Sequence, residues 1–267
     1  MPPRVVADTV AELHPPRKGL LRGTLRRRGI YILPNLFTTV VLFGGFYAIV
    51  QAMNTRFEHA AIAIFIAMVL DFLDGRIARL TRTQSEFGAE YDSLADVVAF
   101  GAAPALVMYE WALRPLGRLG WIVAFAYCAA TALRLARFNV MHDVVDKRFF
   151  QGLPSPAAAA LVAGFVWIVD DFNVQRTDWL YAVACIVTLF AGITMVTSVP
   201  FYSFKDINFR RSVPFWTVLA IVLGLSLVST YPALVLFGLF VAYSLSGYAM
   251  WGWNVHRTRA ASRRPPG

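Results

Sequence analysis

The chain has 267 residues and a formal net charge of +9; 58% of its residues are hydrophobic and only 15% are charged. An ordinary soluble domain carries about 25% charged and about 45–50% apolar residues, so this composition excludes a water-soluble globule and predicts an integral membrane protein. The two cysteines lie in separate apolar runs and the four histidines have no HxxxH spacing, which excludes a disulfide framework and argues against a zinc site.

The N-terminal segment, residues 1–30, is basic and holds several prolines but no apolar core, so a cleavable signal peptide is not expected. We expect this segment to lie in the cytoplasm. Its stretch 19–28 combines leucines with arginines and predicts a short amphipathic helix on the anionic lipid surface. The alternative is a solvated tail that only sets the orientation of the chain.

The rest of the chain contains eight apolar stretches, each near the roughly 20 residues that a transmembrane helix needs. The predicted fold is therefore an all-α integral membrane protein with about eight transmembrane helices in residues 31–255, followed by a disordered basic tail at 256–267. Two stretches are short and Tyr231-Pro232 leaves a very tight connection, so a re-entrant segment is the alternative there. The stretches are 31–52, 57–79, 92–112, 119–140, 155–171, 178–199, 214–230 and 232–253.

The basic residues predict the orientation of these helices, because loops on the cytoplasmic side carry the excess of lysine and arginine. With eight spans, 21 of the 25 basic residues fall on the side of the two termini. Only Arg56, Arg114, Arg118 and Arg176 remain for the other side. We therefore expect both termini in the cytoplasm of a bacterial-type cell, with the protein in the cytoplasmic membrane, and we expect no nucleic-acid partner.

Four aspartates interrupt the apolar pattern. Asp71 and Asp74 come late in the second stretch, and Asp92 and Asp96 come at the start of the third. An ionised residue near a helix centre costs about 2.5–3.5 kcal/mol on insertion scales, so these four carboxylates need cations.

Helical spacing predicts which way these carboxylates point. At about 100° per residue, one face of the second helix carries two of them with small residues, and one face of the third carries the other two with a glycine. Facing one another, the two stripes would form an oxygen-only cage for hard divalent ions that opens to the cytoplasm. The two stripes are Asp71, Asp74, Gly75 and Ala78, and Gly88, Asp92 and Asp96.

Such a cage suits phosphoryl transfer, because paired metal ions can activate an attacking oxygen and neutralise a phosphate. Arg79 and Arg82, at the same mouth, are candidates to bind a pyrophosphate. Two alternatives remain from spacing alone. The aspartates could relay ions in a divalent-cation transporter, or they could form structural ion pairs with the arginines.

The pattern Asp71-x2-Asp74-Gly75-x2-Ala78-Arg79-x8-Gly88-x3-Asp92-x3-Asp96 resembles, position for position, the signature of the CDP-alcohol phosphatidyltransferase family. The resemblance implies a membrane enzyme that binds two divalent ions, Mg²⁺ or Mn²⁺, and transfers a phosphatidyl group from a CDP-linked lipid to an alcohol. It implies that the first three aspartates are metal ligands and that Asp96 is a ligand or the general base. Gly75, Ala78, Arg79 and Gly88 would lie against the CDP-lipid.

Three further stretches, 34–38, 132–139 and 150–157, resemble the branch of this family that uses serine as the alcohol. CDP-diacylglycerol and L-serine are then the expected substrates, within membrane lipid, and relatives imply a homodimer. Glycerol 3-phosphate or an inositol phosphate is the alternative alcohol. In the first of these stretches, Asn35 and Thr38 are candidates to contact the cytidine, or they serve only the start of the helix.

Arg134 and Arg137 lie at i, i+3 on one helix face, where a planar anion such as the serine carboxylate can bind. Alternatively, they neutralise the aspartates or hold lipid phosphates. Ser155, in Gly152-Leu153-Pro154-Ser155-Pro156, is a candidate N-cap of the fifth helix, with Pro156 in the first turn. Free backbone N–H groups of this segment are candidates to contact phosphate or substrate, and an ordinary helix start is the alternative.

Overall fold

The computed structural model describes residues 18–81, 85–141, 149–202 and 215–262, and within these ranges it describes most side chains from Asn35 to Trp253. Long helices dominate the described chain. They are α1 (Lys18–Met53), α2 (Phe57–Thr81), α3 (Glu86–Asp96), α4 (Ala103–Met108), α5 (Arg118–Met141), α6 (Ser155–Asp171), α7 (Asp178–Val196), α8 (Phe215–Thr230) and α9 (Pro232–Ser262).

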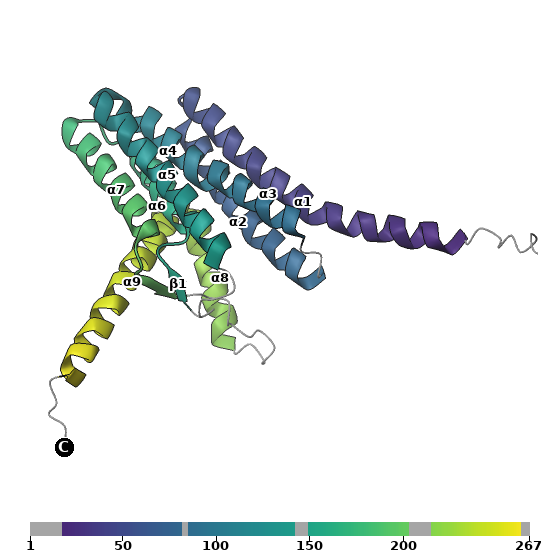
Figure 1. The fold of residues 1–267 in the computed structure, drawn as a ribbon. Coiled ribbons are helices and arrows are strands. Elements are labelled where there is room, and N and C mark those ends of the chain that lie inside the picture. Colours follow the sequence, from purple (N-terminus) through teal and green to yellow (C-terminus); the bar gives the residue numbers. More distant parts are fainter. Residues whose placement is uncertain (1–17, 82–84, 142–148, 203–214, 263–267) are drawn as a thin grey trace, which may run out of the picture.

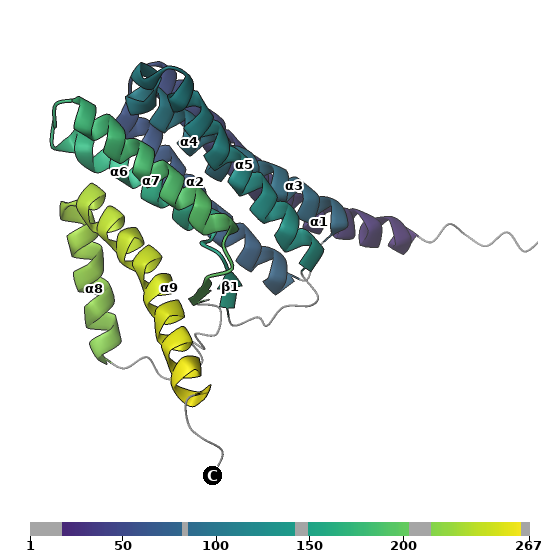
Figure 2. The same cartoon turned by 60° about the vertical axis from the view of Figure 1, so that its left-hand side comes forward.

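Helices α1 to α7 form a bundle, α9 lies against one side of it, and α8 packs against α9 (Figures 1 and 2). Helix α1 packs along α2, α5 packs along α7, and α9 joins the bundle through α6. The N-terminal part of α1 projects beyond the bundle in both views. The end of α2, the start of α3 and the end of α5 lie at the same end of the bundle, where the aspartates of the sequence motif are located.

Residues 86–116 form one continuous helical run that contains two π-helical segments. After α3, Val97–Ala102 forms a π-helical segment; after α4, Tyr109–Leu113 forms a second one, and a 3₁₀ turn at Arg114–Leu116 ends the run. A π-helical segment alters the regular i−4 bonding pattern and is frequent at functional sites. The buried Tyr127 hydroxyl donates a hydrogen bond to the Phe100 carbonyl oxygen at 3.0 Å, which ties the first π segment to α5.

Two short strands, β1 (Phe149–Gln151) and β2 (Pro200–Tyr202), pair antiparallel beside the ends of α5 and α7. Between β1 and α6 the chain turns at Gly152, where φ is +79°. A Cβ atom at this position would collide with the Met195 carbonyl oxygen, so glycine is required both for the backbone conformation and for the close approach.

Small side chains fill much of the interior. Helix α6 is buried over most of its length, and its buried face is rich in alanine. On α1, Gly45 lies against the backbone of Ala99 in the first π segment. Such residues let helix backbones approach closely, which is the main route to packing between helices in lipid.

The outer surface is apolar, as expected for a chain in lipid. Five described segments are long and apolar enough to cross a membrane: 35–53, 86–116, 118–140, 178–196 and 232–253. The sequence prediction of an all-helical integral membrane protein is confirmed in this form, with two short strands added. The other predicted crossings fall on α2, which carries the charged motif, and on α6 and α8, which have 17 and 16 residues.

The helix bounds differ from the predicted stretches in three places. The third helical run begins at Glu86 rather than at 92, because its polar first turns are helical although they are not apolar. Helix α1 is continuous from Lys18 to Met53. The stretch 19–28 is therefore part of this long helix and does not form the separate short helix that the sequence predicts. Helix α9 continues to Ser262 and takes in residues 256–262 of the predicted tail.

Candidate active site

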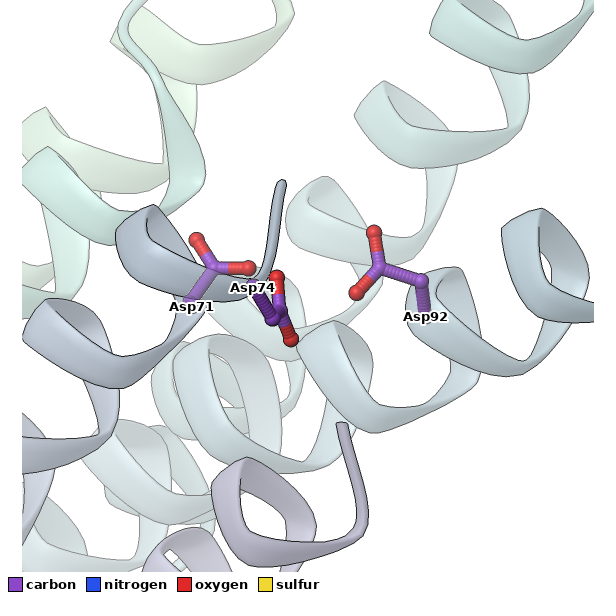
Figure 3. Close-up of side chains that lie close together, drawn as sticks. All are labelled: Asp71, Asp74 and Asp92. Atoms are coloured by element: carbon purple, nitrogen blue, oxygen red, sulfur yellow. The ribbon is translucent and has the colours of Figure 1, made fainter. Parts of the chain in front are cut away.

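The candidate site is a cluster of three carboxylates at one end of the bundle. Asp71 and Asp74 project from α2, and Asp92 projects from α3, so that their side chains converge (Figure 3). One oxygen of each carboxylate lies within 4.8 Å of one oxygen of each of the other two. Asp74 is 4% exposed, whereas Asp71 and Asp92 are half-buried. The cluster therefore has a buried floor and an accessible side.

The neighbours of Asp92 in the sequence fix its helix. The Tyr91 hydroxyl and Thr39 Oγ1 of α1 are 3.0 Å apart, and Asn139 Nδ2 of α5 donates to Ser93 Oγ at 2.9 Å. These two hydrogen bonds join α3 to helices on either side of it. The position of the Asp92 carboxylate is thus set by the packing of three helices.

The middle of α1, from Asn35 to Thr38, forms another wall of the site. Thr38 is buried and its Oγ1 donates to Asp74 Oδ2 at 3.4 Å. Ser85 caps α3 by accepting a hydrogen bond from the Gly88 N–H at 3.0 Å. A Cβ atom at Gly88 would lie 3.0 Å from Ser85 Oγ and 3.4 Å from Asn35 Oδ1, so this glycine brings α3 close to the Asn35 amide. The structure therefore places Asn35, Thr38 and Gly88 beside the aspartates.

Asp96 lies one turn beyond Asp92 and is not part of the three-carboxylate cluster. It lies within electrostatic range of Asp71, Asp74 and Asp92 on one side and of Arg134 on the other. Its Oδ1 atom is buried without a hydrogen-bond partner among the described residues. A buried carboxylate oxygen without a partner is costly, which marks it as a group available to a ligand.

Arg134, on α5, is the half-buried cation next to Asp96. Its Nη1 donates to Ser155 Oγ of α6 at 2.7 Å, and its Nε has no hydrogen-bond partner in the described part of the chain. Tyr243 of α9 lies within electrostatic range of Arg134. Sequence reasoning missed Tyr243, because nothing in its surroundings in the sequence distinguishes it from other aromatic residues of a lipid-facing helix.

Arg137 is exposed and binds elsewhere. Its Nη2 donates to Gln151 Oε1 at 2.5 Å, and its Nη1 donates to the Val196 carbonyl oxygen at 3.5 Å. The two arginines thus both reach the connection between α5 and α6, but Arg134 faces inward to Asp96 and Arg137 lies at the edge.

Two predictions for the connection before α6 need correction. Ser155 is the first residue of α6 and does not cap it; its hydroxyl accepts from Arg134 instead, because α6 and α5 pack side by side at this point. The Gly152 and Leu153 N–H groups are not free, since they donate to the Val199 and Thr194 carbonyl oxygens. The expected proline in the first turn of α6 is confirmed.

The remaining predicted contacts of the CDP-lipid lie on α2. Gly75 is half-buried and directly follows Asp74. Ala78 and Arg79 belong to the last turns of this helix, but their side chains lie outside the described residues, as does Arg82 altogether.

The donor set defines what this cluster can bind. Three carboxylates supply only oxygen ligands, a set that fits a hard divalent cation such as Mg²⁺, Mn²⁺ or Ca²⁺ and not a thiophilic one. A cation held there would also offset the mutual repulsion of the three negative charges. The residues present therefore fit a divalent metal ion.

Comparisons with known proteins agree with this chemistry. Residues 31–191 match the model of the family described as CDP-alcohol phosphatidyltransferase. A CDP-diacylglycerol–serine O-phosphatidyltransferase of Helicobacter pylori is 37% identical over 219 residues, which is 81% of this chain and 90% of the relative. An enzyme with the same description from Mycobacterium bovis is 40% identical over 154 residues, which is 55% of this chain and 54% of the relative. Another, from Methanocaldococcus jannaschii, is 35% identical over 143 residues, which is 54% of this chain and 63% of the relative.

Proposed function

We infer the function from one premise, that this chain belongs to the CDP-alcohol phosphatidyltransferase family. It transfers the phosphatidyl group of CDP-diacylglycerol to the hydroxyl of L-serine, giving phosphatidylserine and CMP. The predicted enzyme class and its serine-using branch are thereby confirmed. We further propose roles for individual residues and for metal ions, which the geometry of the site supports, and an orientation in the membrane, which the distribution of basic residues supports.

The metal site is proposed to hold two divalent ions, Mg²⁺ or Mn²⁺, with Asp71, Asp74 and Asp92 as ligands. Bound there, the ions supply a positive field that binds the pyrophosphate and offsets the negative charge that develops during transfer. The convergence of the three carboxylates within 4.8 Å supports this assignment. Asp96 lies near enough to interact with all three, so it serves either as a further ligand or as a base at the edge of the centre.

The nucleotide end of CDP-diacylglycerol is proposed to lie between α1, α2 and α3. Gly75 and Gly88 leave room for the substrate next to the aspartates, and Asn35 and Thr38 offer an amide and a hydroxyl on the α1 wall. Ala78 and Arg79, one turn further along α2, complete the surface that the family motif assigns to the CDP group. The diacylglycerol part extends from this surface into lipid.

The single observation that carries the alcohol pocket is the pair of buried, unsatisfied atoms on neighbouring residues of opposite charge, Asp96 Oδ1 and Arg134 Nε. Serine is a zwitterion with a hydroxyl, so it presents a carboxylate to a cation and donor groups to an anion. In this arrangement Arg134 and Ser155 hold the serine carboxylate, and Asp96 faces the hydroxyl. Arg137, at the outer edge, supplies a second cation for the carboxylate or for a lipid phosphate.

The transfer step then follows from these positions. Asp96 takes the proton of the serine hydroxyl while the serine oxygen forms a bond to the lipid-side phosphorus. The bond from that phosphorus to the bridging pyrophosphate oxygen breaks, and CMP leaves with the electron pair. Phosphatidylserine remains anchored by its acyl chains.

The experiment is an alcohol panel with the purified full chain, CDP-diacylglycerol and Mg²⁺ or Mn²⁺, with CMP release as the measurement. We expect release with L-serine and scarcely any with ethanolamine, which lacks the carboxylate. A site built to bind a polar group discriminates against an analogue without that group by a factor of about 10⁴ in kcat/KM. Release with glycerol 3-phosphate or an inositol phosphate but not serine would reject the serine assignment and keep the family chemistry. No CMP with any alcohol, together with movement of divalent cations across vesicles, would favour the transporter instead.

Arg134→Lys tests the carboxylate contact in the same assay. An ammonium group cannot reproduce the guanidinium fork, so we expect a higher KM for serine with little change in binding of the CDP-lipid. Arg114→Lys is the matched control, because Arg114 is exposed and forms an ion pair with Glu110 at the other end of the bundle. A variant Arg134→Lys with an unchanged KM for serine would remove Arg134 from the pocket.

A further inference from the structure

An apolar groove lies between α5 and α7, outside the site described above. It has a volume of about 350 Å³ and is open along one side. Figures 1 and 2 show the two helices side by side. The residues that line it are Ala126, Tyr127, Ala130, Leu189, Gly192, Ile193, Val196 and Thr197.

Small residues create the groove. Ala126 and Ala130 present only methyl groups, and Gly192 has no side chain opposite them. A Cβ atom at Gly192 would lie 3.3 Å from Tyr127 Cα, so the glycine allows α5 and α7 to pack closely at the floor. From Leu189 to Val196 the lining covers eight residues of helix, which corresponds to ~10 Å along the groove.

A cation stands at one end of this groove. Residues 126, 130 and 137 differ by only about 40° around α5, so Arg137 continues the face that lines the groove. Its Nη1 contacts the carbonyl oxygen of Val196, which is itself a lining residue. The groove therefore runs from an exposed guanidinium into apolar surroundings, which is the arrangement of charge and apolar surface that a phospholipid has.

The position of this cation connects the groove to the chemistry. Arg137 lies one turn from Arg134, and Arg134 lies beside Asp96 at the proposed site of transfer. A phosphate bound near Arg137 would place the rest of its lipid headgroup toward that site. This continuity favours the substrate over a bystander lipid of the bilayer.

We propose that the α5–α7 groove receives one acyl chain of CDP-diacylglycerol, with Arg137 facing the phosphate at its polar end. The proposal rests on the proposed function and adds to it that one chain of the substrate leaves the bulk lipid for a protein surface. Lipid tails are as apolar as the groove, so moving the acyl chain into it gains no hydrophobic free energy. The gain in binding free energy comes from packing and from fixing the headgroup, and we expect it to be moderate.

The test compares two lengths of acyl chain in mixed micelles. Ala126 is exposed and lines the groove, so Ala126→Phe fills the groove without disturbing the core. We expect the KM for CDP-dioleoylglycerol to rise roughly three- to tenfold, while the KM for CDP-dihexanoylglycerol and the KM for serine stay unchanged. Ala249→Phe, at an exposed position of α9, is the matched control. We expect it to leave the KM for both lipids and the KM for serine unchanged.

The outcomes separate the two proposals. Wild-type protein that releases no CMP from either lipid would overturn the proposed function. Active wild-type protein with Ala126→Phe equally impaired on both lipids, or impaired on neither, would overturn the groove and leave the function standing. As a second measurement, CDP-diacylglycerol with a diazirine in one acyl chain should crosslink to α5 and α7, and crosslinks confined to other helices would contradict the proposal.

Discussion

At the scale of single residues, the site brings three negatively charged side chains together, and their neighbours must hold them in place against mutual repulsion. Carboxylate oxygens about 4 Å apart repel one another by about 1 kcal/mol in water and about 4 kcal/mol at the effective dielectric of a protein surface. Asp71, Asp74 and Asp92 nevertheless converge, because hydrogen bonds from Thr38, Tyr91 and Ser93 join the elements that carry them. A divalent cation bound to these three carboxylates would offset this repulsion, which supports the proposed metal site.

Neutralising one of the proposed ligands tests metal binding separately from folding. In Asp92→Asn we expect CMP release to fall by about 100-fold or more, because an amide is a weaker ligand for a hard cation. The protein should fold and insert at least as well as wild type, since a charge that repels its neighbours is removed. Asp171→Asn, an exposed acid at the other end of the bundle, is the control. Near-normal turnover of Asp92→Asn at saturating metal would reject Asp92 as a ligand.

Asp96 is expected to behave differently, because a base acts in the chemical step alone. Asp96→Asn should lose turnover by orders of magnitude but keep metal-dependent binding of CDP-diacylglycerol, measured directly with labelled lipid. Its Oδ1 lacks a hydrogen-bond partner in the described structure, so the substitution breaks no contact of that atom. Parallel loss of lipid binding and turnover would make Asp96 primarily a metal ligand.

At the scale of the elements, the packing of α1 against the first π segment supports the site. Gly45 faces the backbone of Ala99, and a Cβ atom added there would lie 2.5 Å from Ala99 Cα. The helix that carries Asp92 and Asp96 enters this π segment immediately after Asp96. The contact therefore fixes α1, with Asn35 and Thr38, relative to the aspartates of α3.

Gly45→Ala is expected to destabilise the protein by about 1–3 kcal/mol, the usual cost of inserting a methyl group into a well-packed core. A lower midpoint of thermal unfolding in detergent, with a loss of CMP release at elevated temperature, would show it. Gly224→Ala on α8 is the control, because a Cβ atom there meets nothing within 4 Å. Equal midpoints for Gly45→Ala and wild type would mean that α1 shifts freely against α3.

The elements also explain how far the sequence alone could lead. The convergence of Asp71, Asp74 and Asp92 was predictable, because helical periodicity fixes the faces of α2 and α3 and a short connection makes the helices neighbours. The contact of Arg134 with Ser155 was not, since it depends on how α5 and α6 pack after a turn at Gly152. The π segment after Asp96 left no signal in the apolar pattern either, because Val97–Ala102 is apolar in any helical winding. Tyr243 reaches the site only through the packing of α9, far away in the sequence.

At the scale of the whole molecule, the bundle has two unlike ends. The described structure places the aspartates, Arg134 and Arg137 at one end, and the connections at 54–56 and 172–177 at the other (Figures 1 and 2). Arg176 belongs to this second end, where it lies over the rings of Phe57 and Trp111 and pairs with Asp170. Arg176, one of the few basic residues assigned to that side, thus holds the connection at 172–177 against the start of α2 and the second π segment.

The orientation in the bilayer is the prediction that belongs to this scale. Since 21 of the 25 basic residues fall on the side of the termini, we propose that both termini and the site for CDP-diacylglycerol and serine face the cytoplasm. The test replaces Cys128 and Cys185, which lie in α5 and α7, and adds single cysteines at Arg114, Gln175, Lys147 or Asn208. A membrane-impermeant thiol reagent applied to intact cells should label positions 114 and 175 and spare 147 and 208, which become labelled only after the cells are opened. The latter two positions lie in connections outside the described residues, so labelling reports their side independently of the structure. Labelling of 147 or 208 in intact cells would overturn the eight-span arrangement together with the cytoplasmic site, because adding or removing one span moves every later connection to the other side.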